Sequence, residues 1–325
     1  MLTLSSLLIA PILFFGLGFF AQAVRSDLKL PSDITKALSV YLLAGIGLHG
    51  GAELAQVGFG TALHAVAAAL LLGFSLPLVG YALLRRACGM DKFNAAAIAA
   101  HYGSVSAGTF LTAIAYLQSR GISYESHAVI MLAVMESPAI IVALLLAQYA
   151  RRDARIGSAS TQPAHRILVE TLTHGSVVLL LGSMLIGASV TSKSFEAIAP
   201  FFQTIFSGAL CLFLLEMGIE AARRIGEFRK VGVVLATFGI AMPLIGGFAG
   251  LLVGHYWLDL STGGTTLVAL LGASASYIAV PPAVRLAIPE ANPSFYLTLS
   301  LGITFPFNVV IGIPVFHAAS QWMSS

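Results

Sequence analysis

Apolar residues occur along the chain in long runs, separated by short stretches of polar and charged residues. A run of about 20 apolar residues is enough for one helix to cross the hydrocarbon core of a bilayer. These runs, read against the loop signals between them, predict an all-α membrane protein with ten transmembrane helices. The predicted segments are residues 4–24, 34–50, 60–84, 93–119, 127–150, 166–190, 196–221, 231–256, 264–286 and 293–319.

Composition supports a membrane protein, because 58% of the residues are hydrophobic and only 10% are charged. A soluble domain carries about 25% charged residues, so this chain cannot cover a water-facing surface with polar groups. The two cysteines, Cys88 and Cys211, fit neither a disulfide framework nor a zinc motif. No basic stripe interleaved with aromatic residues indicates nucleic-acid binding. We therefore expect a membrane-lipid environment, no cofactor and no nucleic-acid partner.

The positions of the basic residues orient the predicted helices. With the N-terminus outside, all but two of the 17 Lys and Arg residues fall in or beside inner loops, and the exceptions are Arg120 and Lys193. Cytoplasmic loops carry the excess of Lys and Arg in membrane proteins. The sequence thus predicts a multi-pass protein of the bacterial inner membrane with both termini in the periplasm.

The longest polar stretch divides the ten predicted helices into two groups of five. We interpret residues 151–165 as a cytoplasmic linker between a first repeat, residues 1–150, and a second repeat, residues 166–325. Because each half has an odd number of spans, the second half would be inserted upside down relative to the first. This is the inverted-repeat arrangement of many secondary transporters.

Short similarities between the halves support a repeat. A Ser-x-Ser pair stands in the fourth predicted helix, at Ser104 and Ser106, and another in the ninth, at Ser274 and Ser276. A weaker match joins the second and seventh helices, at 42–48 and 214–220. All these matches have an offset close to 170 residues.

Glycine and serine clusters predict that the fourth and ninth helices are broken near the middle of the membrane, at 103–109 and at 272–280. Pro281 and Pro282 follow the second cluster and disfavour continuous helix before them. Freed backbone groups are tolerated in a membrane only where protein or a watery cavity satisfies them. The start of each second half-helix would offer N–H groups and a positive dipole end to a small anion. The candidate substrate-binding residues are Gly103, Ser104, Val105, Ser106, Ala107, Gly108, Thr109, Ser274, Ala275, Ser276, Tyr277, Ile278 and Ala279.

A simpler interpretation of these clusters is close helix packing, since small-xxx-small patterns such as Ser104 with Gly108 are common between membrane helices. Two clusters at repeat-equivalent positions favour a ligand site over packing alone.

Ionisable groups inside a bilayer are costly and mark functional sites. Glu136 precedes Ser137-Pro138 in the fifth predicted helix and is a candidate cation or proton site; the alternative is a structural hydrogen bond to the interrupted backbone. Glu216 could be structural or part of a gate, and His101 is interpreted as an ordinary buried histidine. The candidate sodium ligands are Glu136, Ser276, Thr304 and Asn308; Thr304 and Asn308 could equally satisfy a kink at Pro306.

Enzyme motifs are missing from the chain. It has no H-E-x-x-H, and none of its aspartates falls in a predicted helix. A serine nucleophile at Ser104 or Ser106 would have only His101 as a nearby base. We therefore expect a protein that is not an enzyme.

At these residues the chain resembles the sodium-dependent bicarbonate transporters first known from cyanobacteria. The resemblance covers nearly the whole chain and is clearest at 46–51, 105–109, 135–139 and 273–316, above all at 281–294, PPAVRLAIPEANPS. It implies a homotrimer of two five-helix inverted repeats, with a gate domain, a core domain and an elevator-like movement. It also implies a small PII-like regulatory partner on the cytoplasmic side. Tyr277 stands where the family pattern has an aspartate, and Glu136 replaces another.

The sequence and the resemblance together predict sodium-coupled uptake of bicarbonate or a similar small anion. The alternatives are a proton- or sodium-coupled carrier of another small organic anion, and a passive anion channel.

Overall fold

The computed structural model describes residues 9–57, 59–136, 138–153, 169, 173, 175–225 and 228–324, and within these ranges it contains helices and no strands. The linker predicted at 151–165 is only partly described. Its first three residues, Arg151 to Asp153, are the end of a helix, and residues 154–165 lie outside the described part, so the linker stays a prediction. Ser137 also lies outside it.

The first half of the chain contains three uninterrupted helices followed by two interrupted ones. The uninterrupted helices are α1 (Ala10–Ala23), α2 (Ser32–Val57) and α3 (Phe59–Arg86). The fourth predicted segment divides into α4 (Lys92–Gly103) and α5 (Ala107–Ser119), and the fifth into α6 (His127–Met135) and α7 (Pro138–Asp153).

The second half contains more irregular helices. It begins with α9 (Gly175–Ser189) and with α10 (Ser192–Ala199), which runs through a π-helical turn, η2 (Pro200–Thr204), to α11 (Phe206–Ile225). The eighth segment is α12 (Phe228–Leu252) with η3 (Val253–Trp257), and the ninth divides into α13 (Thr262–Ala273) and α14 (Val280–Ala287). The tenth comprises α15 (Pro293–Leu297), η4 (Thr298–Thr304), α16 (Phe305–Phe307), η5 (Asn308–Gly312) and α17 (Ile313–Ser324).

Five helical segments in the described residues are long and apolar enough to cross a membrane. They are Ala62–Arg86, His127–Asp153, Ser194–Ile225, Gly232–Trp257 and Pro293–Ser324. Shorter apolar helices occur at Ala10–Ala23, Val178–Ser189 and Thr262–Ala273. The protein is therefore a multi-pass membrane protein, and the count of ten spans in two inverted repeats stays a prediction.

One group of helices crosses at backbone contact. Helix α1 packs on α11, and α2 packs on α9 and on α11. A Cβ atom at Gly18 would lie 1.9 Å from the Leu215 carbonyl oxygen, and one at Gly51 would lie 2.0 Å from the Met184 carbonyl oxygen. Only glycine permits such close approach, and small residues are how membrane helices reach it. We call α1, α2, α9 and α11 the gate group.

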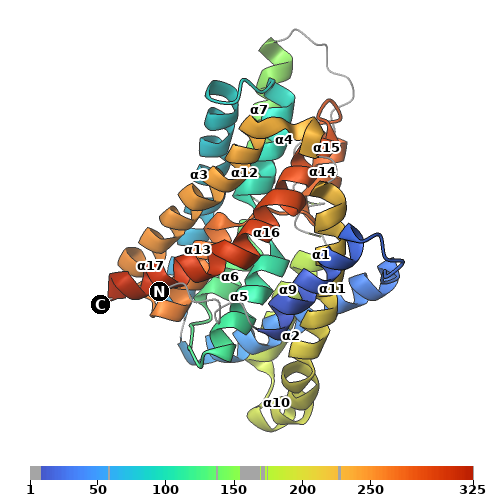
Figure 1. Cartoon of the computed structure of the whole chain (residues 1–325). Coiled ribbons are helices and arrows are strands. Elements are labelled where there is room, and N and C mark those ends of the chain that lie inside the picture. Colours follow the sequence, from blue (N-terminus) through green and yellow to red (C-terminus); the bar gives the residue numbers. More distant parts are fainter. Residues whose placement is uncertain are drawn as a thin grey trace.

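A second group of helices surrounds the divided fourth and ninth segments. In it α3 packs on α4 and α6, and α4 packs on α7; in the second half, α12 packs on α13 and η4, and α13 packs on α17. Figure 1 shows α10 at one end of the molecule, with α7, α4 and α15 at the opposite end. We use the name core group for α3, α4, α5, α6, α7, α12, α13, η4 and α17.

Candidate functional site

Both predicted helix breaks are present, and each is shorter than predicted. Helix α4 ends at Gly103, and α5 begins at Ala107 after extended backbone at Ser104 and Ser106. The side chain of Ser106 caps α5 by accepting a hydrogen bond from the Thr109 N–H at 3.2 Å, which is the normal role of serine at a helix start. Helix α13 ends at Ala273, and regular helix resumes at Val280.

The two breaks lie against each other. The Ser106 N–H donates to the Ser274 hydroxyl at 3.0 Å. The Ser276 N–H donates to the His101 carbonyl at 2.8 Å, and the Ser276 carbonyl accepts from Nδ1–H of the His101 ring at 2.6 Å. These bonds satisfy backbone groups that lipid could not. Residues about 170 positions apart thus form one crossing point.

His101 has a larger role than its sequence position indicated. Its backbone and its ring both bind Ser276, and the fully buried ring stacks on Tyr296 with centroids 4.5 Å apart. The sequence showed only a histidine two residues before a break. Its pairing with Ser276 needed the three-dimensional crossing to be seen.

The two half-helix starts differ as anion donors. At α5, the N–H groups of Ala107 and Gly108 have no hydrogen-bond partner within the described residues. At α14, the Val280 N–H donates to the Ser276 hydroxyl at 3.4 Å, and Pro281 and Pro282 have no N–H. Hence the α5 start offers two unpaired N–H groups within the described residues, and the anion-binding role expected of both half-helix starts stays a prediction.

A small cavity of about 30 Å³ lies at the crossing, with room for one or two water molecules. It is lined by Ser39, Leu43, Val105, Ser106, Ala107, Leu111, Glu136, Phe213, Ser276, Tyr277, Ile278 and Ala279. Most of the second predicted cluster and the centre of the first therefore border one space, together with Glu136.

Six predicted substrate residues do not line this cavity: Gly103, Ser104, Gly108, Thr109, Ser274 and Ala275. Gly103 packs against Pro77, and the Thr109 hydroxyl bonds to that of Ser106 at 3.1 Å. The Ser104 hydroxyl is buried and makes no hydrogen bond within the described part of the chain. These residues lie outside the cavity lining, in and beside the two breaks.

Tyr277 covers the start of α5. A Cβ atom at Gly108 would lie 2.2 Å from the Tyr277 hydroxyl oxygen, so the glycine leaves the room that this hydroxyl occupies. The hydroxyl is buried and has no hydrogen-bond partner among the residues that the structure describes. A shorter side chain such as aspartate would leave this space open, so Tyr277 accounts for part of the cavity's small volume.

Glu136 places a carboxyl group in the cavity. It lies between α6 and α7, where Pro138 starts a new helix, and is 9% exposed. Its Oε2 atom is buried without a partner, and the carboxyl makes no ion pair within the described residues. A buried carboxylate needs a compensating positive charge or a proton, so the cation or proton role expected of Glu136 stays a prediction.

The other three predicted cation ligands do not all line this cavity. Ser276 lines the cavity with Glu136, whereas Thr304 and Asn308 do not. The Thr304 hydroxyl donates to the Gly239 carbonyl at 2.6 Å and accepts from the Tyr102 hydroxyl at 2.7 Å. The Asn308 side chain donates from Nδ2 to the Ala273 carbonyl at 2.8 Å, at the end of α13. Both residues therefore hold the helices around the break.

Glu216, which the sequence left as structural or gating, binds the backbone between α1 and α2. Its Oε2 accepts from the Leu30 N–H at 3.0 Å. This contact favours the structural role within the gate group.

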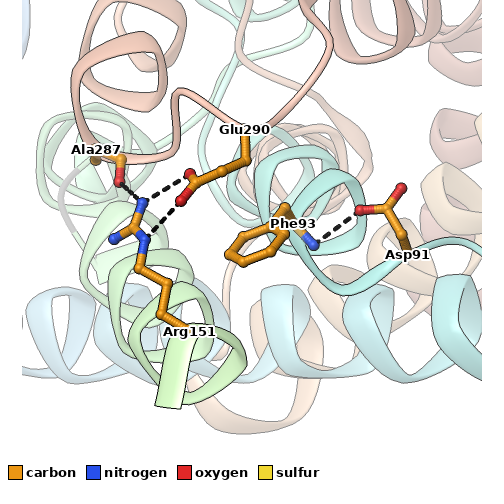
Figure 2. A network of polar contacts seen from close by, with 5 residues as sticks. All are labelled: Asp91, Phe93, Arg151, Ala287 and Glu290. Carbon is orange, nitrogen blue, oxygen red and sulfur yellow. Dashed lines mark hydrogen bonds and ion pairs between the residues drawn. The ribbon is translucent and has the colours of Figure 1, made fainter. Parts of the chain in front are cut away.

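A polar network closes the end of the core group opposite α10. The Arg151 guanidinium donates two bonds of 2.8 Å to the Glu290 carboxylate and one of 2.8 Å to the Ala287 carbonyl (Figure 2). Arg151 holds the pKa of the Glu290 carboxyl below its usual range through these charge-assisted bonds. Because Arg151 is in α7 and Glu290 follows α14, the network joins the two halves of the chain.

Comparison with known proteins agrees with this picture. A search of curated proteins finds no significant match. A family profile described as the Na+-dependent bicarbonate transporter superfamily matches residues 10–321, almost the whole chain. Its members are transporters, which agrees with the expectation of sodium-dependent bicarbonate transport and of no enzyme activity. The chain therefore belongs to the Na+-dependent bicarbonate transporter superfamily.

Proposed function

We propose that this protein couples sodium to the uptake of bicarbonate, or a similar small anion, at the crossing of its two broken helices. The observation that carries the proposal is the meeting of Glu136, Ser106 and Ser276 in one cavity beside the α5 start. Hydroxyl oxygens and a carboxylate are ligands that a hard cation such as sodium accepts. Free N–H groups at a helix start are donors for an anion.

The proximity of Glu136 to the anion donors gives a physical reason for coupling. An ionised Glu136 would repel a bicarbonate in the same small cavity. Two unit charges 4 Å apart repel by about 4 kcal/mol at an effective dielectric constant of about 20. A sodium ion bound to Glu136 removes this repulsion, so the anion binds well only after the cation.

The anion itself would be held by α5. The N–H group of Ala107, which lines the cavity, supplies a donor, and the Ser106 hydroxyl, already capping the helix, can turn toward the ligand. Tyr277 must swing away to make room, because the cavity in this conformation has only about 30 Å³. The conformation described therefore corresponds to a closed site.

The movement that we propose is a shift of the core group against the gate group, in the elevator manner. The gate helices cross at backbone distance at Gly18 and Gly51, which supports a rigid frame. The core helices pack in the same order in both halves, which supports ten spans in two inverted repeats. The inner-membrane location, periplasmic termini, homotrimer and PII-like partner belong to the same proposal and rest on the loop charges and the resemblance.

Labelled bicarbonate uptake into proteoliposomes tests the proposal. We expect uptake with an inward sodium gradient and little with a potassium gradient. The Ser106→Trp variant should lose uptake because the indole fills the cavity, and Ser106→Ala should keep the fold with weaker uptake. Ser189→Trp, at an exposed position of α9, is the control. Equal uptake in potassium, or full activity of Ser106→Trp, would contradict the proposal.

Proton coupling is the second candidate, because the unpartnered Glu136 carboxyl could carry a proton in place of sodium. A pH jump without sodium separates the two. Uptake driven by an acidic exterior alone would favour protons, whereas no response would favour sodium.

A further inference from the structure

A second and larger cavity, of about 310 Å³, lies between the gate and core groups. Its walls come from α2, α5, α6, α10, η2 and α11, and they include His49, Gln118, Tyr124, Phe202 and Gln203. No residue lines both this cavity and the one at the helix crossing. Phe195, Ile198 and Ala199 of α10 also line it, and Figure 1 shows α10 at one end of the molecule.

The two cavities follow the same helix faces. On α5, Leu111 lines the small cavity, and Ile114 and Gln118 line the large one. These positions are three and seven residues after Leu111, so they share one face of the helix, and the rise along α5 to Gln118 is about 10 Å.

The other two helices repeat this arrangement. On α2, Leu43 lines the small cavity, and Ile46 and Gly50 line the large one. On α11, Phe213 lines the small cavity and Phe206 lines the large one. Both spacings are helical-face spacings. The large cavity therefore lies next to the small one, along the contact between the gate and core groups.

A septum of apolar side chains separates the two spaces. Its six members are each 8% exposed or less: Leu43, Ile46, Leu111, Ile114, Phe206 and Phe213. A hydrophobic constriction of this kind excludes water and ions until its walls separate. Four members come from the gate helices α2 and α11, and two, Leu111 and Ile114, come from the core helix α5. Relative motion of the two groups would therefore open the septum.

The mouth of the large cavity suits a charged solute from water. Gln118, Gln203 and Ile198 are exposed there, and none of the lining residues is an Asp, Glu, Lys or Arg. An approaching anion thus meets amide groups and no fixed negative charge. This end of α5 leads into the loop that the Lys and Arg distribution predicts to be periplasmic.

We infer that the large cavity is the outer vestibule of the transport path, and that the septum is the closed barrier between it and the Glu136 cavity. The inference deepens the proposed function and rests on it for the identity of the solute. The geometry of the vestibule and the septum does not depend on the proposed function, because both are built from residues of the chain itself.

Cysteine accessibility tests the inference. In a background with Cys88→Ser and Cys211→Ser, intact cells are exposed to a charged, membrane-impermeant thiol reagent. We expect Gln118→Cys to be labelled from outside with loss of uptake. Leu111→Cys, behind the septum, should resist labelling until Phe206→Ala is added. Arg152→Cys, at the predicted inner end, should be labelled only in inverted vesicles.

Three results would overturn the inference. They are labelling of Gln118→Cys only from the inner side, labelling of Leu111→Cys as fast as Gln118→Cys, and full uptake after Gln118→Cys is modified. Labelling does not depend on the cargo. If no variant or parent takes up bicarbonate but the labelling pattern holds, the proposed cargo fails and the vestibule stands.

Discussion

The contact between Gly108 and Tyr277 allows a sharp test of how the start of α5 is built. A Cβ atom added by Gly108→Ala would lie 2.2 Å from the Tyr277 hydroxyl oxygen and 3.2 Å from a Phe305 ring carbon. Normal contact begins near 3.4 Å, so the tyrosine must retreat by about 1 Å. Phe305 packs edge-on against the Tyr277 ring with centroids 5.3 Å apart, so this retreat disturbs the aromatic packing.

The expected cost is that of overpacking, about 1–3 kcal/mol, reduced by about 1 kcal/mol because alanine favours helix over glycine. Gly108→Ala should therefore lower the unfolding free energy of the purified protein moderately and lower bicarbonate uptake more strongly. Tyr277→Phe removes the oxygen that clashes. The double variant should recover much of both losses, giving a coupling energy of about 1 kcal/mol or more in a double-mutant cycle.

The matched control is Gly182→Ala in α9, where an added Cβ has no other atom within 4 Å. It should be neutral or slightly stabilising. The assay is detergent-solubilised unfolding followed by circular dichroism, with uptake measured on the same preparations. The reasoning is refuted if Gly108→Ala behaves like Gly182→Ala, or if Tyr277→Phe leaves the defect unchanged.

Two further predictions concern regions away from the cavity. Gly18→Ala places a Cβ atom 1.9 Å from the Leu215 carbonyl oxygen, a backbone atom that cannot rotate away. Helices α1 and α11 must then separate, so thermal stability should fall markedly. Gly16→Ala on the same helix, with open space around it, should leave thermal stability unchanged. Arg151 lowers the pKa of Glu290 in the folded state, so its stabilisation is complete above the unfolded-state pKa near 4.5 and is lost as pH falls through the lower folded value. Glu290→Gln should therefore flatten the acid limb of a stability-versus-pH profile, and an unchanged limb would show that the pair contributes little.

Local patterns in the sequence revealed the two helix breaks and Glu136. Clusters of glycine and serine within apolar segments made 103–109 and 272–280 recognisable, and at the second cluster Pro281 and Pro282 added to the signal. Glu136 stood out because acidic groups are rare in membrane helices. The repeat offset near 170 residues linked the two clusters, which the hydrogen bond from the Ser106 N–H to the Ser274 hydroxyl joins in the structure.

Features that depend on how helices cross were not visible in the sequence. Thr304 and Asn308 share a helix face with the expected spacing, but their partners, Gly239 and Ala273, belong to other helices. The role of Tyr277 depends on its meeting Gly108, and that of His101 on its meeting Ser276. Such contacts are fixed by the rotation and height of packed helices, which a hydrophobic pattern does not specify.

Direct measurement of sodium binding tests the central claim, that Glu136 in the cavity at the helix crossing holds the coupling cation. Purified protein is titrated with radioactive sodium in a scintillation proximity assay, with Glu290→Gln as a control for loss of an acidic group elsewhere. We predict saturable sodium binding by the parent and by Glu290→Gln, and its loss in a folded Glu136→Gln variant. Unchanged sodium binding by Glu136→Gln would contradict the account.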